Sequence, residues 1–441
     1  MKKTLLSLTQ SLLGASIPVL CYHQVRPESG MTPQKFGSHL DLIRRMGFET
    51  INLARPGFET NFSSTPTRFP KTLSLAPELE YRTAMNIAFV NSTRKWGGVK
   101  TWILDFSKEM NRLGHEVTIF GRPSVFIDAC ADVGIRAHGT SFGFDYNPST
   151  IFFFLYQFLQ NNTDVLFTNI SKDIRTAGIA ARLLKIPVIR MVGNPEDIAL
   201  TSKEKILHSW IRPKYLCSCE YIRDGLLDRH SYIKLEDTHV ILTGKHIPKN
   251  HPSEPHSPRQ LIMTSRLSPE KGHAALLRCL KKIKDKGLPF HVHILGSGIL
   301  ESELKNLASD MNLNDRITWH GFQNDVTPYL HNADIYIHPA TNEGLPNSLQ
   351  EAMAFGLIPV ASDIGGMKEV WPFELKNLLL SVEDLEAQLT NTIDYLLQSN
   401  PKDFYEYKIV AKNMALKTFE LNKLALDFER WTMDIIKSKQ Y

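Results

Sequence analysis

Residues 342–370 have the sequence NEGLPNSLQEAMAFGLIPVASDIGGMKEV, in which two glutamates, Glu343 and Glu351, lie eight positions apart. Apolar residues recur at helical spacing around the second glutamate until Gly356, where a glycine is suited to end a helix. Residues 357–361 are then apolar throughout, as in a short buried strand. The stretch predicts a loop, a helix and a strand, with one carboxylate before the helix and one inside it.

The start of this predicted helix is suited to a phosphate group. Pro346 fits a first helical turn, and Asn347 or Ser348 can cap it. Free N–H groups and the positive end of the helix dipole attract an anion at such a start. One of the two carboxylates can then face a sugar ring, while the other accepts hydrogen bonds from ribose hydroxyls.

The spacing of the two glutamates, followed by Ala-Met-Ala-x-Gly and by Gly365-Gly366 with Glu369, resembles the donor-site signature of glycosyltransferase family 4. The resemblance covers about residues 85–425 and is strongest over 261–370. It implies an α/β protein with the GT-B fold, in which two Rossmann-like domains face a cleft, and a reaction that retains anomeric configuration. For the glutamate spacing alone, a solvated helix face is the alternative explanation.

The composition is that of an ordinary globular protein. The chain has 441 residues, of which 42% are hydrophobic and 22% charged, enough for two or three domains. Its net charge of +5 is far from the footprint of a nucleic-acid-binding protein. No apolar run reaches the roughly 18 residues that span a bilayer, and the five cysteines lack paired spacing. We therefore expect a cytoplasmic protein. The family resemblance, together with the mildly basic first domain, suggests peripheral contact at the cytoplasmic membrane.

The N-terminal part has a resemblance of its own. Residues 17–53 resemble the opening of the polysaccharide deacetylase (NodB-like) family, through the string Pro-Val-Leu-x-Tyr-His that ends at His23. The Asp-Asp-Gly and His-x-x-x-His motifs of that family are missing, so no metal could be held to activate water. We therefore expect 1–55 to be a truncated remnant with a non-catalytic His23. Residues 56–84, rich in Ser, Thr and Pro, predict a linker.

Residues 85–245 predict the first Rossmann-like domain, which the resemblance assigns to the acceptor. A buried strand, a loop with glycines, a helix and a second strand follow one another over 85–120, as in a βαβ unit of a parallel sheet. Gly97 and Gly98 in the loop let the backbone approach a ligand, and Trp96 is placed to wall the cleft. A tight turn without ligand is the alternative, because the G-x-G-x-x-G spacing is absent.

The chain departs from the family pattern after the strand predicted over 186–190. The family commonly places a histidine there that can touch the sugar 6-hydroxyl, whereas this chain has Met-Val-Gly-Asn over 191–194. Asn194 and Asp173 are the candidates to substitute for it. Cys219 likewise occupies the serine position of a Ser-Glu-Tyr-x-Arg-like string.

Two segments of the first domain carry apolar residues suited to an interface. Residues 203–214 predict a basic amphipathic helix that could sit on anionic lipid, with a solvated outer helix as the alternative. Residues 151–158, Ile-Phe-Phe-Phe-Leu-Tyr-Gln-Phe, are too short to span a membrane and predict a buried or interfacial helix face.

Four prolines within residues 246–258 predict the interdomain linker. Residues 259–425 then predict a Rossmann-like domain for the donor nucleotide. Arg266 and Lys271 lie at a strand-to-helix turn and supply a planar fork and a compact charge for a diphosphate, which matches the phosphate pair of the family. Residues 426–441 predict a C-terminal helix that crosses back to the first domain.

These arguments give a complete candidate site. The residues expected to act in catalysis are Glu343, Arg266 and Lys271. The residues expected to bind the donor are Gly97, Gly98, Gly296, Gly298, Phe322, Leu345, Pro346, Asn347, Ser348 and Glu351.

The resemblance implies a retaining glycosyltransferase that moves a sugar from a nucleotide diphosphate, with UDP favoured by family frequency. The acceptor would be a hydroxyl of a glycan or lipid-linked intermediate in the synthesis of envelope polysaccharide or lipopolysaccharide. The chain has no Asp-x-Asp triplet, so we expect no metal, and the leaving-group charge falls to Arg266, Lys271 and helix N-termini. No side chain is identified as the general base.

Three alternatives remain at this stage. A non-catalytic binder of nucleotide sugars or glycans, a decayed paralogue, would show no transfer that depends on Glu343. A metal-dependent carbohydrate esterase would be inhibited by a chelator. A sugar-nucleotide epimerase on the same fold would isomerise the donor without an acceptor.

Overall fold

The structure, a computed structural model, describes residues 84–94 and 97–438. The chain divides after Glu80 into two units, and all described residues belong to the second unit. The predicted deacetylase-like remnant with His23, almost all of the predicted linker after it, and Trp96 therefore lie outside the described residues.

The first domain is built on a seven-stranded sheet with the order β3-β2-β1-β4-β5-β6-β7, and all its strand pairs are parallel. Its strands are β1 (Asn86–Asn91), β2 (Glu116–Gly121), β3 (Arg136–Gly139), β4 (Val165–Thr168), β5 (Val188–Val192), β6 (Lys214–Cys217) and β7 (Thr238–Val240). In register, Asn86 lies opposite Glu116 and Ile87 opposite Val165. The strand order reverses between β1 and β4, which is where doubly wound sheets open a crevice at their carboxyl ends.

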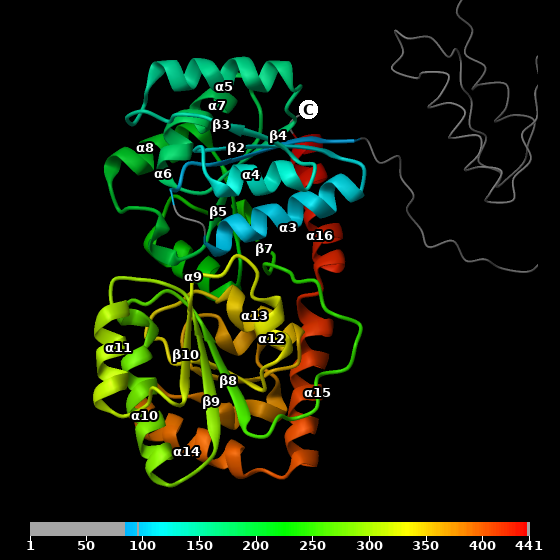
Figure 1. Ribbon diagram of the computed structural model, residues 1–441. Coiled ribbons are helices and arrows are strands. Elements are labelled where there is room, and N and C mark those ends of the chain that lie inside the picture. The colour runs from blue at the N-terminus through cyan, green and yellow to red at the C-terminus, as the bar shows by residue number, and fades with distance from the viewer. Residues whose placement is uncertain (1–83, 95–96, 439–441) are drawn as a thin grey trace, which may run out of the picture. The chain divides into compact units, whose positions relative to one another are not determined.

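Helices cover both faces of this sheet (Figure 1). They are α3 (Gly98–Arg112), α4 (Val125–Asp132), α5 (Pro148–Gln160), α6 (Ser171–Asp173), α7 (Ile179–Leu183), α8 (Ser202–Ile211) and α9 (Glu220–Arg229). Successive residues of β1 point to opposite faces, so Phe89 packs with α3 and α4 in one core. Val90 packs with α5 and α7 in the other core. Burial on both faces explains why β1 is apolar throughout.

The second domain has a six-stranded parallel sheet with the order β10-β9-β8-β11-β12-β13. Its strands are β8 (Arg259–Thr264), β9 (Phe290–Leu295), β10 (Ile317–Gly321), β11 (Ile335–His338), β12 (Ile358–Ser362) and β13 (Leu379–Leu380). Its helices are α10 (His273–Asp285), α11 (Glu301–Asp310), α12 (Thr327–His331), α13 (Asn347–Ala354), α14 (Leu385–Gln398) and α15 (Pro401–Thr418). The two Rossmann-like domains expected from the sequence are confirmed.

The last helix, α16 (Leu421–Ser438), returns to the first domain and completes its core. Phe428 stacks on Phe167 at 4.9 Å between ring centroids and meets Trp102 edge-on at 5.9 Å. The predicted boundary at residue 426 is therefore too late. The helix begins earlier, at Leu421, because backbone hydrogen bonds with Lys245 fix the residues on both sides of Glu420.

Another contact joins the two domains at the start of α9. The carboxylate of Glu369, in the second domain, accepts hydrogen bonds from the backbone N–H groups of Glu220 at 2.7 Å and Tyr221 at 2.8 Å. A carboxylate at this position satisfies free N–H groups of the helix start and opposes its dipole. The Gly-Gly-x-x-Glu and Cys-Glu-Tyr-x-Arg strings, separate in the sequence, thus form one interdomain contact.

One detail of the first domain differs from the sequence-based expectation. Lys214, predicted to end the basic helix, instead begins β6. The helical region before β5 begins at Ser171 and includes a π-helical segment, Ile174–Gly178. Among residues 84–94 and 97–438, no helix combines the length and apolar composition that crossing a bilayer requires.

Candidate active site

A cavity of about 1080 Å³ lies at the carboxyl ends of the strands and is lined by residues of both domains. All thirteen residues predicted for the site line this one cavity. They are Gly97, Gly98, Arg266, Lys271, Gly296, Gly298, Phe322, Glu343, Leu345, Pro346, Asn347, Ser348 and Glu351. The structure therefore brings the predicted site together, while the role of each residue stays a prediction.

Helix α13 begins without a side-chain cap. Pro346 occupies the cap position in extended conformation, so Asn347 and Ser348 are the first helical residues and the prediction that either caps the helix is wrong. The Ser348 hydroxyl instead lies 2.6 Å from the Tyr336 hydroxyl. Because no side chain caps them, the N–H groups of the first turn are available to an anion in the cavity.

Lys271 and Glu343 form an ion pair on the floor of the cavity. The side chain of Lys271 is 9% exposed, and its Nζ donates to Oε1 of Glu343. His338, at the end of β11, lies 3.6 Å from the same oxygen. Burial lowers the pKa of His338 to about 3, so its imidazole is neutral near pH 7 and this contact is not an ion pair.

Arg266 lies at the mouth of the cavity with 72% of its side chain exposed, 3.5 Å from Glu270. The glycine turn after β9 packs directly on the loop that carries Arg266. Gly296 has φ +135°, and a Cβ there would lie 1.9 Å from the carbonyl oxygen of Ser265. A Cβ at Gly298 would lie 2.2 Å from the carbonyl oxygen of Leu267. These positions require glycine because the two loops touch backbone to backbone.

The first-domain loop reaches the start of α13 across the cavity. A Cβ at Gly98 would lie 2.4 Å from Nδ2 of Asn347, so the glycine lets the two domains approach closely at this point. Asn169, which directly follows β4, also lines the cavity, and its Nδ2 donates to the carbonyl of Met191 at 3.4 Å.

Neither candidate for the missing histidine lines the cavity. Asp173 is fully buried and accepts hydrogen bonds from the backbone N–H groups of Ser92 at 3.0 Å and Asn169 at 3.2 Å. Asn194 donates its backbone N–H to Asp197 at 3.0 Å in a short helical turn. The structure therefore places both residues in hydrogen bonds that fix loops of the first domain and not in the lining of the cavity.

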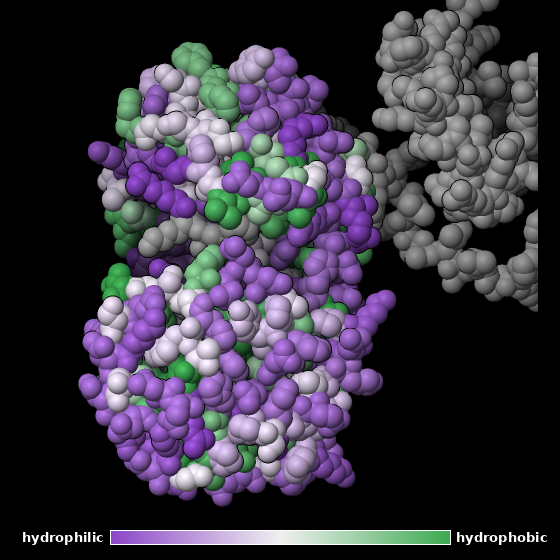
Figure 2. Space-filling model, viewed as in Figure 1, coloured by the Kyte–Doolittle hydropathy of each residue, from purple (hydrophilic) through white to green (hydrophobic). Residues whose placement is uncertain are grey.

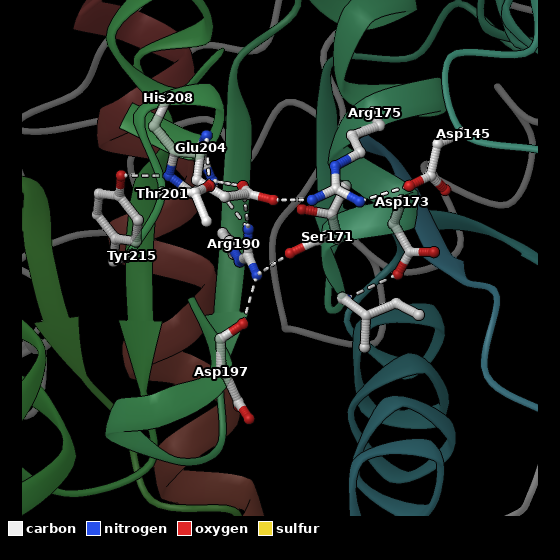
Figure 3. Close-up of polar contacts among 12 residues, drawn as sticks. Asp145, Ser171, Asp173, Arg175, Arg190, Asp197, Thr201, Glu204, His208 and Tyr215 are labelled. Carbon is white, nitrogen blue, oxygen red and sulfur yellow. Dashed lines mark hydrogen bonds and ion pairs between the residues drawn. The ribbon is translucent and has the colours of Figure 1, made fainter. Parts of the chain in front are cut away.

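A buried polar network supports this side of the cavity (Figure 3). Arg190 on β5 is 0% exposed and donates to the Asp197 carbonyl at 2.9 Å and to the Ser171 hydroxyl at 3.2 Å. Its Nη1 lies 3.9 Å from Glu204 on α8, and Glu204 also binds Arg175. The network joins β5, α6 and α8 and thereby holds the loop over 193–197 in place.

The sequence did not indicate several further residues that line the cavity. They include Arg94, Ser124, Asn169, Ser218, Thr243, Thr264 and His338. Asn169, Ser218 and His338 lie at the carboxyl end of a strand, and that position is the signal that could have identified them. Within the described residues, no three His, Cys, Asp or Glu side chains are placed to hold a metal ion.

Comparison with known families gives two successive matches. The family model described as Glycosyltransferase Family 4 matches residues 96–244, and the one described as Glycosyl transferases group 1 matches residues 246–410. These ranges correspond to the first and second domains of the structure.

Individual relatives are similar over part of their length. The amylovoran biosynthesis glycosyltransferase AmsK of Erwinia amylovora is 32% identical over 140 residues, which are 30% of this chain and 34% of the relative. The UDP-Gal:alpha-D-GlcNAc-diphosphoundecaprenol alpha-1,3-galactosyltransferase of Escherichia coli is 24% identical over 258 residues, 53% of this chain and 66% of the relative. The chain thus matches less than two thirds of either relative.

The fold is similar over nearly the whole described chain to a solved structure, HepE of Anabaena in complex with UDP and glucose. The TM-score is 0.66 at 18% identity, and the match covers 79% of this chain and 100% of the other. Because the two family models match its two domains in succession and its sheets have the same architecture, the chain belongs to glycosyltransferase family 4 and has the GT-B fold.

Proposed function

We propose that the protein is a retaining glycosyltransferase that transfers a sugar from a UDP-sugar to a hydroxyl of a glycan or lipid-linked acceptor in envelope polysaccharide synthesis. The observation that carries the proposal is the cavity floor. There the Lys271–Glu343 ion pair and the uncapped start of α13 line the same space, which the exposed side chain of Arg266 faces from the mouth. These groups suit a diphosphate joined to a sugar.

Transfer would proceed by electrostatic stabilisation of the leaving diphosphate. Lys271 is held in place by its carboxylate partner, so its charge needs no reorganisation when negative charge develops on the phosphate. Arg266, 72% exposed, would form a bidentate contact with phosphate oxygens from the cavity mouth. Glu343 would orient the sugar and offset positive charge near its anomeric carbon. We propose that no metal takes part in this step. We also propose that the acceptor hydroxyl attacks the sugar on the same face that the leaving diphosphate vacates.

The relatives support the choice of donor and acceptor. The name of the Escherichia coli relative specifies a UDP-galactose donor and an acceptor linked to diphosphoundecaprenol. The Anabaena structure contains UDP and glucose. We therefore place a UDP-sugar in the second-domain half of the cavity and a lipid-linked or glycan acceptor against the first domain.

Thermal stability against a panel of UDP-, GDP-, ADP- and TDP-sugars tests the donor. The wild-type melting temperature is expected to rise with UDP-sugars, because a ligand that binds only the folded state stabilises it. Arg266→Ala and Glu351→Ala should each abolish that rise. No shift with any donor would overturn the proposed function, and a shift kept in both variants would place the donor elsewhere.

The outer helices of the first domain support peripheral contact with an anionic membrane. Phe152 and Tyr156 on α5 are 70% and 59% exposed, and apolar side chains gather over this helix in Figure 2. On α8, Ile206 is 69% exposed beside the exposed lysines Lys203 and Lys205. Exposed apolar and basic side chains together suit the interface of an anionic bilayer.

Vesicle co-sedimentation tests this contact. The wild-type protein is expected to bind vesicles that contain phosphatidylglycerol and to bind phosphatidylcholine vesicles several-fold more weakly. Replacing both Phe152 and Ile206 with serine should weaken binding about a hundredfold or more, since each buried apolar side chain contributes roughly 1.5–3 kcal/mol. Phe373→Ser is the matched control, because Phe373 is 78% exposed on the second domain. Equal loss in the control, or no wild-type binding, would overturn the membrane contact.

A further inference from the structure

Lys245 comes from the segment between the domains, and its side chain reaches the donor half of the cavity. Its Nζ donates to Oε1 of Glu351 at 2.9 Å, and the lysine side chain is only 6% exposed. Glu351, on α13, lines the cavity with 25% of its side chain exposed. Within residues 84–94 and 97–438, the other oxygen of this carboxylate, Oε2, has no hydrogen-bond partner.

The main chain fixes the point from which Lys245 extends. Its N–H donates to the carbonyl of Phe419 at 2.7 Å, and its carbonyl accepts from the N–H of Leu421 at 3.0 Å. These bonds hold Lys245 against the junction of α15 and α16. The ammonium group is therefore anchored at both its backbone and its charged end.

The residue two positions earlier makes a parallel contact with α13. The amide of Gln350 donates to the Thr243 hydroxyl at 2.7 Å, and Gln350 is 0% exposed. Thr243 and Lys245 thus hold two successive residues of α13, and Thr243 itself lines the cavity.

Lys245 also lies near enough to an acidic side chain of the first domain to influence its charge. Burial raises the pKa of Asp105 on α3, and the nearby charges of Lys245, Lys108 and His246 act in the opposite direction. Lys245 therefore lies close to carboxylates from both domains, Asp105 and Glu351.

We infer that Lys245 is a positioning residue for the donor, which holds one oxygen of Glu351 so that the other faces the ribose hydroxyls of the nucleotide. The inference rests on the proposed function, because it takes Glu351 as the ribose ligand. Through Lys245, the segment between the domains would then take part in donor recognition.

The test measures the Kd of UDP and of 2′-deoxy-UDP by calorimetry, with the full chain. The wild-type protein is expected to bind UDP about tenfold more tightly than 2′-deoxy-UDP, which is the effect of one charge-assisted hydrogen bond. Lys245→Met and Glu351→Gln should each bring the ratio of the two Kd values close to one. The double variant should bind UDP no more weakly than Glu351→Gln alone, because both changes remove the same interaction.

Lys423→Met is the matched control, since Lys423 lies at the same helix junction but is 66% exposed and pairs with Glu420. It should keep the wild-type ratio, and melting temperatures check that each variant is folded. If Lys245→Met does not fold, Lys245→Gln replaces it in the same comparison.

A Lys245 variant that keeps the wild-type ratio, or that weakens both nucleotides equally, would overturn the inference alone, provided that Glu351→Gln still abolishes the preference. A wild-type protein that binds no UDP would overturn the proposed function and the inference with it. If the wild-type protein bound UDP and 2′-deoxy-UDP with equal Kd values, the inference that Lys245 and Glu351 recognise the ribose would be overturned, while the proposed function would stand.

Discussion

Replacing Lys271 with methionine is expected to lower kcat/KM for sugar transfer about a hundredfold. The loss corresponds to roughly 3 kcal/mol in the barrier, the size found when one preorganised group that stabilises developing charge is removed. Methionine keeps most of the side-chain volume but leaves the diphosphate without its buried cation. It also leaves Glu343 without its ion-pair partner, so the carboxylate would repel the donor.

Steady-state kinetics with a UDP-sugar and an acceptor measure this loss, and Glu343→Gln is assayed beside it. Glu343→Gln should also abolish transfer, which distinguishes an enzyme from a non-catalytic binder. The control is Lys282→Met on α10, where the lysine is 54% exposed and pairs with Glu386, and neither residue lines the cavity. If Lys271→Met and Lys282→Met had equal activity, the cavity floor would not be the site of transfer.

Replacing Glu204 with glutamine is expected to destabilise the first domain by about 3–5 kcal/mol, the usual cost of removing one partner from a buried ion pair. Glu204 is 1% exposed, and its loss would leave Arg190 buried without the carboxylate beside it. Differential scanning calorimetry should therefore show a lower melting temperature. Glu196→Gln is the control, because Glu196 is exposed and its pairing with Arg229 is on the surface.

The same carboxylate should make stability depend on pH in acid. Burial alone would raise the pKa of Glu204, but the contacts with His208, Arg175 and Arg190 lower it to about 2. An unfolded glutamate titrates near pH 4.3. Its stabilising contribution is therefore complete above about pH 4.3 and is lost as the pH falls towards 2. Glu204→Gln should lack this part of the acid destabilisation, and an unchanged pH profile would contradict the assignment.

Much of the candidate site could be predicted because its residues occupy positions that the local sequence specifies. Arg266, Lys271 and Glu343 lie in the connections between a strand and the following α-helix, where parallel sheets place their ligands. Gly356, with φ +76°, ends α13 as predicted. The apolar runs of β1, β4 and β12 were recognisable because both faces of each strand are buried.

The rest depends on contacts between distant residues. Lys245 and Glu351 are 106 positions apart, and only the helix junction behind Lys245 brings them together. Arg190 could not be recognised as buried, because its network draws partners from three separate helices and loops. Strand β3 was missed because Arg136–Gly139 is short and has no fully buried residue, so it shows no apolar pattern.

The return of α16 to the first domain has a consequence for the order in which the protein can fold during synthesis. The strands of the first domain leave the ribosome early, yet the surface formed by Phe89, Trp102 and Phe167 stays uncovered until Phe428 has been translated. The entire second domain emerges in between. A nascent chain released before Leu421 would therefore contain all strands of both sheets but an unfinished first core, with aromatic side chains exposed to solvent and to other chains.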